Sequence, residues 1–413
     1  MSGLTAISLF TGAGGLDYGF EAAGFRTAVA LEIDARCCET LRRNRAWPII
    51  ERDITNVPTD ELLGTAKLQP GEVDVLIGGP PCQPFSKSGF WATGEAKRLN
   101  DPRATTLECY LRVLAEARPR AFLLENVEGL RFRGKDEGLR LIQSRLAAIN
   151  ETRGTRYRAS IATLNAADYG VPQHRRRVMV VGFRDGEAFD FPRPTHIDPA
   201  DADWADNRPR HTTAWDALHD MPEHIDTATK VNGKWAELLP TIPEGSNYLW
   251  HTDRGGGEPL FGWRRRYWSF LLKLAKDQPS WTIQAQPGPA TGPFHWDDRR
   301  LTMREMARLQ TFPDDVEIVG SISDAQRQLG NAVPSLLAEM MARSIAARLL
   351  SRATDGDPPS LSLRAAPVAP PPPRVPAPVP KRFLALRGQH AAHPGTGKGA
   401  RASARGKTLT AAE

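Results

Sequence analysis

The stretch Ala6-Ile7-Ser8-Leu9-Phe10-Thr11-Gly12-Ala13-Gly14-Gly15 decides the fold that we predict for this chain. Its first five residues are mostly apolar and predict a short buried strand, and the glycines that follow predict a tight turn. Residues 16–23 then have the apolar spacing of a helix, and residues 27–31 predict a second strand. Strand, glycine-rich turn, helix and strand in this order open a doubly wound α/β fold that binds nucleotides.

The residues around this turn indicate which nucleotide to expect. Glu32 ends the second strand 20 positions after Gly12, where a carboxylate can bind the hydroxyls of a ribose. Asp17 stands where the dinucleotide fingerprint has its third glycine, so a nicotinamide cofactor is disfavoured. A third unit places Asp53 near another strand end. Taken alone, a glycine-rich turn is also compatible with a purely structural role.

Composition and charge narrow the class of protein. Of the 413 residues, 40% are hydrophobic and 25% charged, which is ordinary for a soluble globular protein. The chain has no apolar run of about 18 residues and no signal peptide at its start, so we expect a cytoplasmic protein. The net charge of +6 comes from residues 352–413, which contain ten Lys or Arg and three Asp or Glu. Residues 1–351 contain 44 basic and 45 acidic residues and are therefore nearly neutral. The basic balance is therefore not evidence that the body binds nucleic acid.

A cysteine follows the fourth predicted strand. Residues 73–77 are apolar and lead into Gly78-Gly79-Pro80-Pro81-Cys82-Gln83-Pro84-Phe85-Ser86, a stiff loop that holds one cysteine at a strand end. The simpler interpretation is a proline-rich turn with an incidental cysteine. The four cysteines are too few for a disulfide framework and lack the paired spacing of a zinc site; they are Cys37, Cys38, Cys82 and Cys109. We therefore expect no metal.

Two further polar elements stand beside predicted strands. Glu125 follows the apolar residues 121–124 directly and so lies at the carboxyl edge of the sheet, although a solvent-facing charge is the alternative. Gln173-His174-Arg175-Arg176-Arg177 stands between the predicted strands 157–161 and 178–183.

The composition and regularity of the sequence change twice in the remainder of the chain. Residues 184–279 are irregular, and eight of the ten tryptophans fall between Trp204 and Trp296, either as a small core or as a recognition surface. A cluster at 262–268 interleaves arginines with aromatic residues, as phosphate-binding surfaces do. Residues 300–310 and 335–350 predict helices with a tight loop at 328–334 between them. Ten prolines between Pro358 and Pro380 favour a disordered tail.

In this order the segments resemble the DNA cytosine-5 methyltransferases over most of residues 5–350. Residues 10–15 look like the first motif of that family, Pro81-Cys82-Gln83 like its nucleophile motif and Glu125-Asn126-Val127 like its acidic motif. Gln173-x-Arg175-x-Arg177 matches the Gln-x-Arg-x-Arg element, and residues 304–313 and 330–334 match the two closing motifs. The aromatic segment stands where the family places its target-recognition domain.

The resemblance implies catalytic roles for four residues. The Cys82 thiolate would add to carbon 6 of cytosine and make carbon 5 nucleophilic, and Glu125 would protonate or hydrogen-bond ring nitrogen 3. Arg175 and Arg177 would hold the pyrimidine oxygen and nearby phosphates and orient Glu125. The cytosine would be flipped out of the duplex. The base that removes the carbon-5 proton is not identified by the sequence.

The resemblance also implies S-adenosylmethionine as methyl donor. Glu32 would bind its ribose, Asp53 its adenine amino group and Phe10 its adenine ring. The backbone of Gly12, Gly14 and Gly15 would pass beneath the methionine part, and Pro81 and Asn331 would close the site.

We therefore predict a Rossmann-like, S-adenosylmethionine-dependent methyltransferase fold with an inserted irregular target-recognition domain. The expected divisions are a catalytic domain at 1–184 and 281–351, a recognition domain at 185–280 and a disordered tail at 352–413. The expected enzyme is a monomer that modifies double-stranded DNA, associates with the nucleoid, and has a separate restriction endonuclease as a candidate partner. A transfer-RNA cytosine-5 methyltransferase and an inactive DNA-binding regulator of the same fold are the alternatives. The target sequence is not predicted.

Overall fold

A seven-stranded sheet with the order β3-β2-β1-β4-β5-β8-β6 forms the centre of the N-terminal part of the chain. The computed structural model describes residues 3–81, 104–128, 137–201, 206–222, 227–263, 266–351 and 357–387. The strands are β1 (Leu4–Leu9), β2 (Phe25–Glu32), β3 (Ile49–Glu51), β4 (Val75–Gly78), β5 (Ala121–Val127), β6 (Ser160–Asn165) and β8 (Arg176–Phe183). The first five in sequence run parallel, and β8 is antiparallel to both neighbours. The predicted doubly wound fold is confirmed, with its switch point between β1 and β4.

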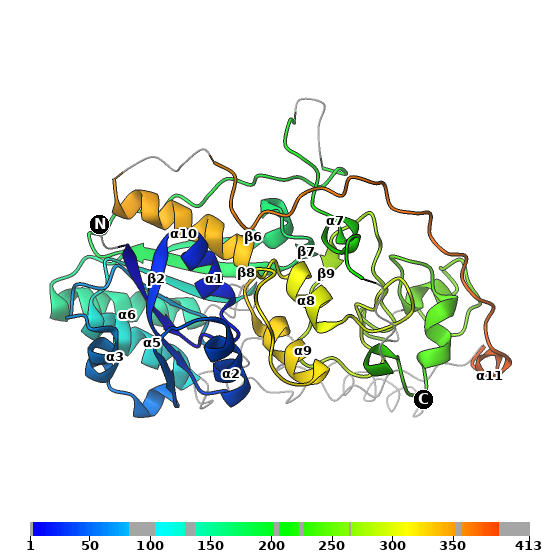
Figure 1. Cartoon of the computed structure of the whole chain (residues 1–413), viewed down its shortest axis with the longest axis horizontal. Coiled ribbons are helices and arrows are strands. Elements are labelled where there is room, and N and C mark those ends of the chain that lie inside the picture. The colour runs from blue at the N-terminus through cyan, green and yellow to red at the C-terminus, as the bar shows by residue number, and fades with distance from the viewer. Residues whose placement is uncertain are drawn as a thin grey trace, which may run out of the picture.

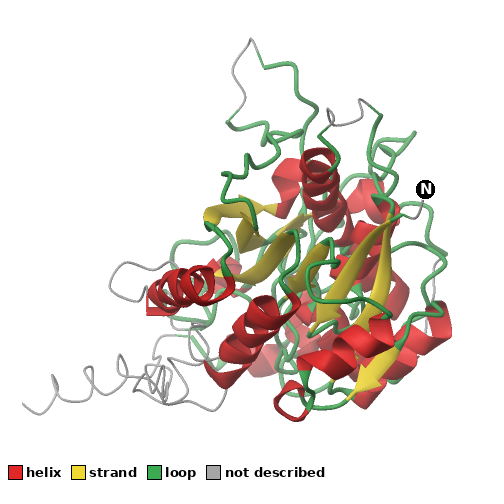
Figure 2. Cartoon of the chain, turned by 90° about the vertical axis from the view of Figure 1, so that its left-hand side faces the viewer, coloured by secondary structure: helices red, strands yellow, loops and turns green. Residues whose placement is uncertain are grey.

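Helices cover both faces of this sheet (Figure 2). Helices α3 (Thr59–Ala66), α5 (Ala104–Ala117) and α6 (Glu137–Arg153) share one hydrophobic core with the sheet. Helices α1 (Gly15–Ala22) and α10 (Ser335–Leu349) share the core on the other face. Alternate residues of one strand face the two cores, because side chains of a strand point to opposite faces.

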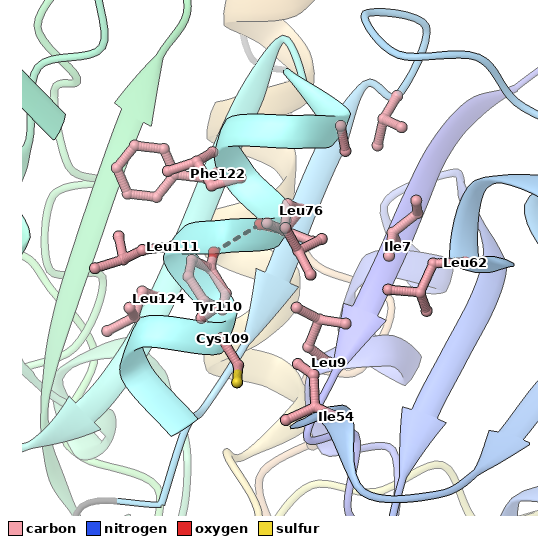
Figure 3. Packing of buried hydrophobic residues seen from close by; sticks show 14 of the residues in the cluster. Ile7, Leu9, Ile54, Leu62, Leu76, Cys109, Tyr110, Leu111, Phe122 and Leu124 are labelled. Carbon is pink, nitrogen blue, oxygen red and sulfur yellow. Dashed lines mark hydrogen bonds between the residues drawn. The ribbon is translucent and has the colours of Figure 1, made fainter. Parts of the chain in front are cut away.

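Tyr110 of α5 fixes its helix on the sheet by a polar contact as well as by packing. Its ring lies among buried side chains that include Leu9, Leu76 and Leu124 (Figure 3). Its hydroxyl donates to the carbonyls of Leu76 and Leu123, at 3.1 and 2.9 Å, in adjacent strands. A buried hydroxyl needs such partners, and these two hold α5 at one position on β4 and β5.

Helix α1 lies against α10 at very short range. A Cβ atom on Gly19 would lie 2.4 Å from both the Cβ of Ala338 and the carbonyl oxygen of Ser335. A Cβ on Gly15 would lie 2.2 Å from the carbonyl oxygen of Val333. The glycines of the first motif therefore also serve helix packing, and they bring the closing motif onto the glycine-rich turn.

The predicted recognition segment consists mainly of loops and short helices around a small core. Its elements are α7 (Ala214–Leu218), the 3-10 helices η5 (Thr227–Thr229), η6 (Ala236–Thr241) and η7 (Tyr248–His251), and β9 (Ser280–Trp281), which pairs with β7 (Gln173–His174). The core contains Leu239, Phe261 and Phe270 and extends to Phe294. Trp235 and Trp250 pack against it, so part of the tryptophan content fills a core.

The remaining elements connect these two parts. They are α2 (Ala35–Asn44), the 3-10 helices η1 (Ile54–Asn56) and η4 (Ala166–Tyr169), α8 (Met303–Leu309), α9 (Ile322–Asn331) and α11 (Lys381–Leu384). Helices α7, α8 and α9 share a further hydrophobic core with Ala13 of the first motif and Tyr18 of α1.

Residues 357–387 correct one expectation, because they are not a disordered tail. They run from α10 across the molecule to α11 at the far edge of the recognition segment, as the orange to brown trace in Figure 1 shows. Phe383 is buried in the small core, and Leu361 packs against the core of α1 and α10. The high proline content made these few apolar contact residues easy to overlook in the sequence. An extended segment forms no regular hydrogen bonds within itself, so such side-chain contacts can hold it in place. Residues 388–413 lie outside the described part of the chain.

Candidate active site

The predicted site residues emerge from the sheet at one level. Sheet pairing places four residues of adjacent strands in one row: Leu31, Leu9, Gly78 and Leu124. The next residues therefore lie at the same height, at the carboxyl edge of the parallel strands: Glu32, Phe10, Gly79 and Glu125. Of these, Glu125 is still inside β5, which continues to Val127 alongside β8. Parallel strands bind ligands at this edge, beside the switch point. The register thus brings together residues that are separated by more than 90 positions in sequence.

Glu32 joins the glycine-rich turn to the end of β2. Its Oε2 accepts from the Gly12 amide at 2.7 Å, and its Oε1 accepts from the amides of Ile33 and Asp34 at 2.9 and 2.8 Å. Burial raises the pKa of Glu32, and the three amides oppose that shift. A carboxylate has about four lone-pair sites, so one on Oε2 remains for a ligand hydroxyl.

The turn beside Glu32 leaves room for a ligand. Gly12 has a φ of 58°, and a Cβ atom there would meet no described atom within 4 Å. Phe10 is half-buried, and Asp53 is exposed after β3. The Oδ1 of Asp53 accepts from the amide and hydroxyl of Thr55, at 2.9 and 2.8 Å. These residues fit a nucleoside that lies on the open side of the turn.

Ile33 belongs to the same rim and was missed by sequence reasoning. It stands between Glu32 and Asp34 with 63% of its surface exposed, although it is aliphatic. Its position beside Glu32, which is predicted to bind a ribose, makes Ile33 a further candidate for contact with the cofactor. The signal in the sequence was an isoleucine between two acidic residues directly after a strand.

The closing motifs lie against this rim. Arg327 of α9 forms an ion pair with Asp34, two residues beyond Glu32. Asn331, the last residue of α9, is exposed, and the following Val333 contacts Gly15 through its carbonyl. That Asn331 closes the cofactor site stays a prediction.

The loop that carries the predicted nucleophile is described only up to Pro81, so Cys82 lies outside the described residues. The amide of Asn126 donates to the carbonyl of Pro80 at 3.3 Å. A Cβ on Gly79 would lie 2.8 Å from Oε2 of Glu125, so the loop backbone passes directly beside this carboxylate. Pro81 is exposed at the end of this approach. The segment that leads to Cys82 is therefore positioned by the acidic motif.

Glu125 and Arg177 form an ion pair at the centre of the edge. The Nε of Arg177 lies 2.9 Å from Oε1 of Glu125, with 13% and 11% of the two side chains exposed. Arg177 pairs with Val127 across β5 and β8, so it reaches Glu125 diagonally, as residues two positions apart on antiparallel strands can. Burial raises the pKa of Glu125, although Arg177 and Arg175 lower it.

Arg175 is placed differently from Arg177. Its side chain is 1% exposed, and it donates to the carbonyls of Ile283 and Gly330 at 3.3 and 2.8 Å. Its Nε is buried and has no hydrogen-bond partner among the described atoms. Burial lowers the pKa of Arg175 well below its usual range. Arg175 therefore connects the strand of the Gln-x-Arg-x-Arg element to the closing motifs.

A buried carboxyl lies beneath the glycine-rich turn. Asp17 of α1 is fully buried and accepts from the hydroxyls of Ser8 and Thr27, at 3.1 and 3.3 Å. Burial raises the pKa of Asp17 to about 7 against these hydrogen bonds. At the position where a dinucleotide fold has glycine, this chain thus has a polar bridge between β1, β2 and α1.

Exposed aromatic residues gather beside the Gln-x-Arg-x-Arg element. Tyr267, Trp268 and Trp281 are 62%, 54% and 37% exposed. The rings of Trp268 and Trp281 lie 5.6 Å apart, and Trp281 lies 5.6 Å from the ring of His174. We call these three residues the aromatic patch. Exposed aromatic clusters on a protein surface mark interaction sites.

The comparisons with known proteins identify the class that this fold and site define. A model of the C-5 cytosine-specific DNA methylase family matches residues 4–347. The chain therefore belongs to this family of DNA cytosine-5 methyltransferases, and the resemblance seen in the sequence is confirmed.

Relatives agree with this assignment. The chain is 42% identical over 373 residues to the Type II methyltransferase M.SacI of Streptomyces achromogenes, covering 84% of this chain and 93% of that protein. It is 34% identical over 345 residues to M.NgoFVII of Neisseria gonorrhoeae, covering 82% and 85%.

Solved structures add support for the fold. A DNMT2 variant from Spodoptera frugiperda superposes with a TM-score of 0.58 at 15% identity, covering 83% of this chain and 99% of that one. The methyltransferase EhMeth of Entamoeba histolytica gives 0.56 at 15%, covering 84% and 99%.

The described residues contain neither a candidate metal site nor a candidate membrane-spanning helix. No group of three or more His, Cys, Asp or Glu within them is arranged to hold a metal ion. In the same part of the chain, each helix is too short or too polar to cross a membrane.

Proposed function

We propose that this enzyme transfers a methyl group from S-adenosylmethionine to carbon 5 of a flipped-out cytosine in a specific double-stranded DNA sequence, through a covalent adduct with Cys82. The observation that carries the proposal is the buried Glu125–Arg177 pair, with the backbone that leads to Cys82 lying against the same carboxylate. A nucleophile and a proton donor must reach the two ends of one ring, and the backbone of Gly79, which leads toward Cys82, passes beside Glu125.

The reaction needs two contributions from the chain's own residues before methyl transfer. The Cys82 thiolate adds to carbon 6, and Glu125 supplies a proton or hydrogen bond to nitrogen 3, so that electron density moves to carbon 5. A carboxyl whose pKa is raised by burial is suited to hold that proton. Once carbon 5 carries the methyl group, loss of its proton to a base allows the Cys82 sulfur to leave.

Arg177 and Arg175 support Glu125 in different ways in this proposal. Arg177 orients the carboxylate directly and lies close enough to the edge to contact the pyrimidine oxygen. Arg175 fixes the strand from which Arg177 extends, and its buried Nε is available for a hydrogen bond. Removing Arg175 would leave two buried carbonyls without donors, which is costly.

S-adenosylmethionine, when bound, supplies the electrophilic methyl group. Phe10 and Ile33 would contact its adenine, Asp53 the adenine amino group and Glu32 its ribose hydroxyls. Gly12, Gly14 and Gly15 would bring backbone close to the methionine part, with Pro81 and Asn331 at its border. The open space at Gly12 and the remaining lone pair of Glu32 support this placement.

DNA would approach over the aromatic patch. The patch adjoins His174, three residues before Arg177, so bases stacked there would lie near the segment that carries Arg177. The relatives named above are Type II methyltransferases, so we place this enzyme in a restriction-modification system, with the endonuclease as a separate protein.

Methylation of genomic DNA by the full chain, read by bisulfite sequencing, tests the proposal and reveals the target. Glu125→Gln should lower kcat by roughly 100-fold or more, because general acid catalysis contributes about 10²–10⁴-fold. Cys82→Ser should remove the covalent complex with a duplex that contains 5-fluorocytosine. Both variants should retain binding to unmodified duplex.

Glu128→Gln is the matched control, because Glu128 lies three residues away and pairs with the exposed Arg176. It should keep nearly full activity. Turnover by Cys82→Ser at the wild-type rate would refute covalent catalysis, and methylation of transfer RNA instead of duplex DNA would refute the substrate.

A further inference from the structure

Residues 357–387, here called the strap, begin against a fully buried carboxylate of α10. The Oε1 of Glu339 accepts from the amide and hydroxyl of Ser360, at 2.7 and 3.1 Å, and its Oε2 accepts from the amide of Leu361 at 2.9 Å. Arg343 pairs with Glu339 at 2.9 Å and also donates to the carbonyl of Asp357. Glu339 is 0% exposed, so the strap supplies partners that a buried charge requires.

The middle of the strap is held by α7. The amide of Ala366 donates to Oδ1 of Asp216 at 2.9 Å, and the indole of Trp215 donates to the carbonyl of Val368 at 2.8 Å. Asp216 is itself buried, and hydrogen bonds from Arg210, Ala366 and Thr213 outweigh burial and lower its pKa to about 2. Two specific side-chain contacts from neighbouring residues therefore fix the path of the strap here.

The far end of the strap completes the small core of the recognition segment. Phe383 is 4% exposed, and its ring lies 5.9 Å from that of Trp235 in a stacked arrangement. Ion pairs flank it, from Arg382 to Glu237 at 3.0 Å and from Arg387 to Glu258 at 2.5 Å. Figure 1 shows α11 at the end of the molecule opposite the sheet.

We propose that the strap positions the recognition segment relative to the catalytic sheet and thereby sets the affinity for DNA. Glu339 lies beside Gly19 of α1, which packs on the sheet, whereas Phe383 belongs to the small core of the recognition segment. One segment thus contacts both the helix layer of the catalytic sheet and the core of the recognition segment. This inference rests on the proposed function, because it assumes that DNA binds across the aromatic patch and the Glu125 edge.

The strap would affect DNA affinity because aligning the two parts of the protein costs free energy. If the two parts rotate relative to one another, part of the DNA-binding energy is used to align them, and the observed affinity falls by the fraction of aligned molecules. Within the described part of the chain, the contacts given above for Glu125 and Arg177 involve no residue of the strap, so we expect this pair to be unchanged once a duplex is bound. Phe383 is therefore a positioning residue, and its loss should change binding and leave the chemical step intact.

Phe383→Ala and the milder Phe383→Leu, made in the full chain, test this inference. We expect Phe383→Ala to raise the Kd for a duplex that contains the target site by about tenfold, equivalent to about 1.4 kcal/mol. Phe383→Leu should raise it by less. With saturating duplex, kcat should stay within about twofold of the wild type. Val375→Ala is the matched control, because Val375 lies on the same strap with 92% of its surface exposed.

The readouts separate positioning from simple loss of stability. Fluorescence anisotropy without S-adenosylmethionine gives the Kd of the folded fraction, and unfolding curves give that fraction for each variant. An unchanged Kd for both Phe383 variants, or a fall in kcat equal to the rise in Kd, would overturn the inference. Failure of the proposed chemistry would instead appear as absent methylation by the wild type, whatever its Kd.

Discussion

Gly19 illustrates how one missing side chain determines helix packing. The site of its absent Cβ is occupied by atoms of α10, 2.4 Å away for the nearest. Gly19→Ala should therefore destabilise the protein by roughly 1–3 kcal/mol, because overpacking forces the helices apart. Urea denaturation followed by circular dichroism measures the loss.

Gly64 of α3 provides the matched comparison. A Cβ there would meet nothing within 4 Å, and its φ is not positive. Gly64→Ala should therefore stabilise the protein by about 0.5–1 kcal/mol through helix propensity. Equal effects of the two alanines would contradict the packing argument.

Single residues were predictable from the sequence where strand ends fixed their place. Glu32, Phe10 and Glu125 lie at one level of the sheet, because each directly follows a run of mostly apolar strand residues. The burial of Arg175 was not predictable, since its partners are carbonyls of residues 283 and 330, more than 100 positions away. Ile33 was missed because an isolated isoleucine reads as part of a strand end.

At the scale of elements, a buried glutamine network joins β7 to α8 and α9. Gln310 is fully buried; its side-chain nitrogen donates to the carbonyl of Leu329, and its Oε1 accepts from Gln173 at 3.2 Å. Gln310→Met keeps the volume but removes both contacts, and it should cost roughly 1–3 kcal/mol of unfolding free energy.

The partly exposed Gln326 of α9 is the control for this prediction. It donates to a single carbonyl, that of Gln284, near the surface, where water can replace it. Gln326→Met should change stability by less than about 0.5 kcal/mol. Denaturant unfolding of both variants at one pH compares them, and a loss below that limit for Gln310→Met would argue against the network.

Helices and strands were predictable where the apolar periodicity and the turn residues at their ends indicated the same element. Strands β1, β2 and β5 and helices α1 and α10 fall within a few residues of their predicted ranges, because apolar periodicity and glycine turns mark them. The strap was not predicted, since proline content suggests disorder, whereas tertiary anchors such as Phe383 decide the outcome. The apolar residues between its prolines were the signal.

For the whole molecule, buried histidines make stability depend on pH. Burial lowers the pKa of His174, His196 and His251 below 6.5. Above about pH 6.5 both folded and unfolded chains are neutral at these residues. As the pH falls below 6.5, the unfolded chain takes up protons first, so the unfolding free energy should decrease, by at most about 1.4 kcal/mol per pH unit for each histidine.

Asp17 acts in the opposite direction and provides a test. Its folded pKa of about 7 lies above the ordinary 3.8, so between these values only the folded chain keeps the proton, and acidification stabilises it. Asp17→Asn removes this gain. Its stability should therefore fall more steeply than that of the wild type between pH 6.5 and 5, by about 1.4 kcal/mol per pH unit. Parallel urea curves at several pH values would reveal equal slopes if the argument is wrong.

The burial of Phe383 also orders events during synthesis. The other aromatic residues of its core have all been synthesised once the ribosome reaches Phe294. The core therefore lacks Phe383 until about 90 further residues have been added, which takes roughly 4–18 s at about 5–20 residues per second. The glycine face of α1 waits longer still for α10. A nascent chain can therefore assemble its parallel strands early while its recognition core stays open. Full affinity for DNA should consequently appear only after translation has passed the strap, and a ribosome that stalls earlier would leave an apolar core available to chaperones.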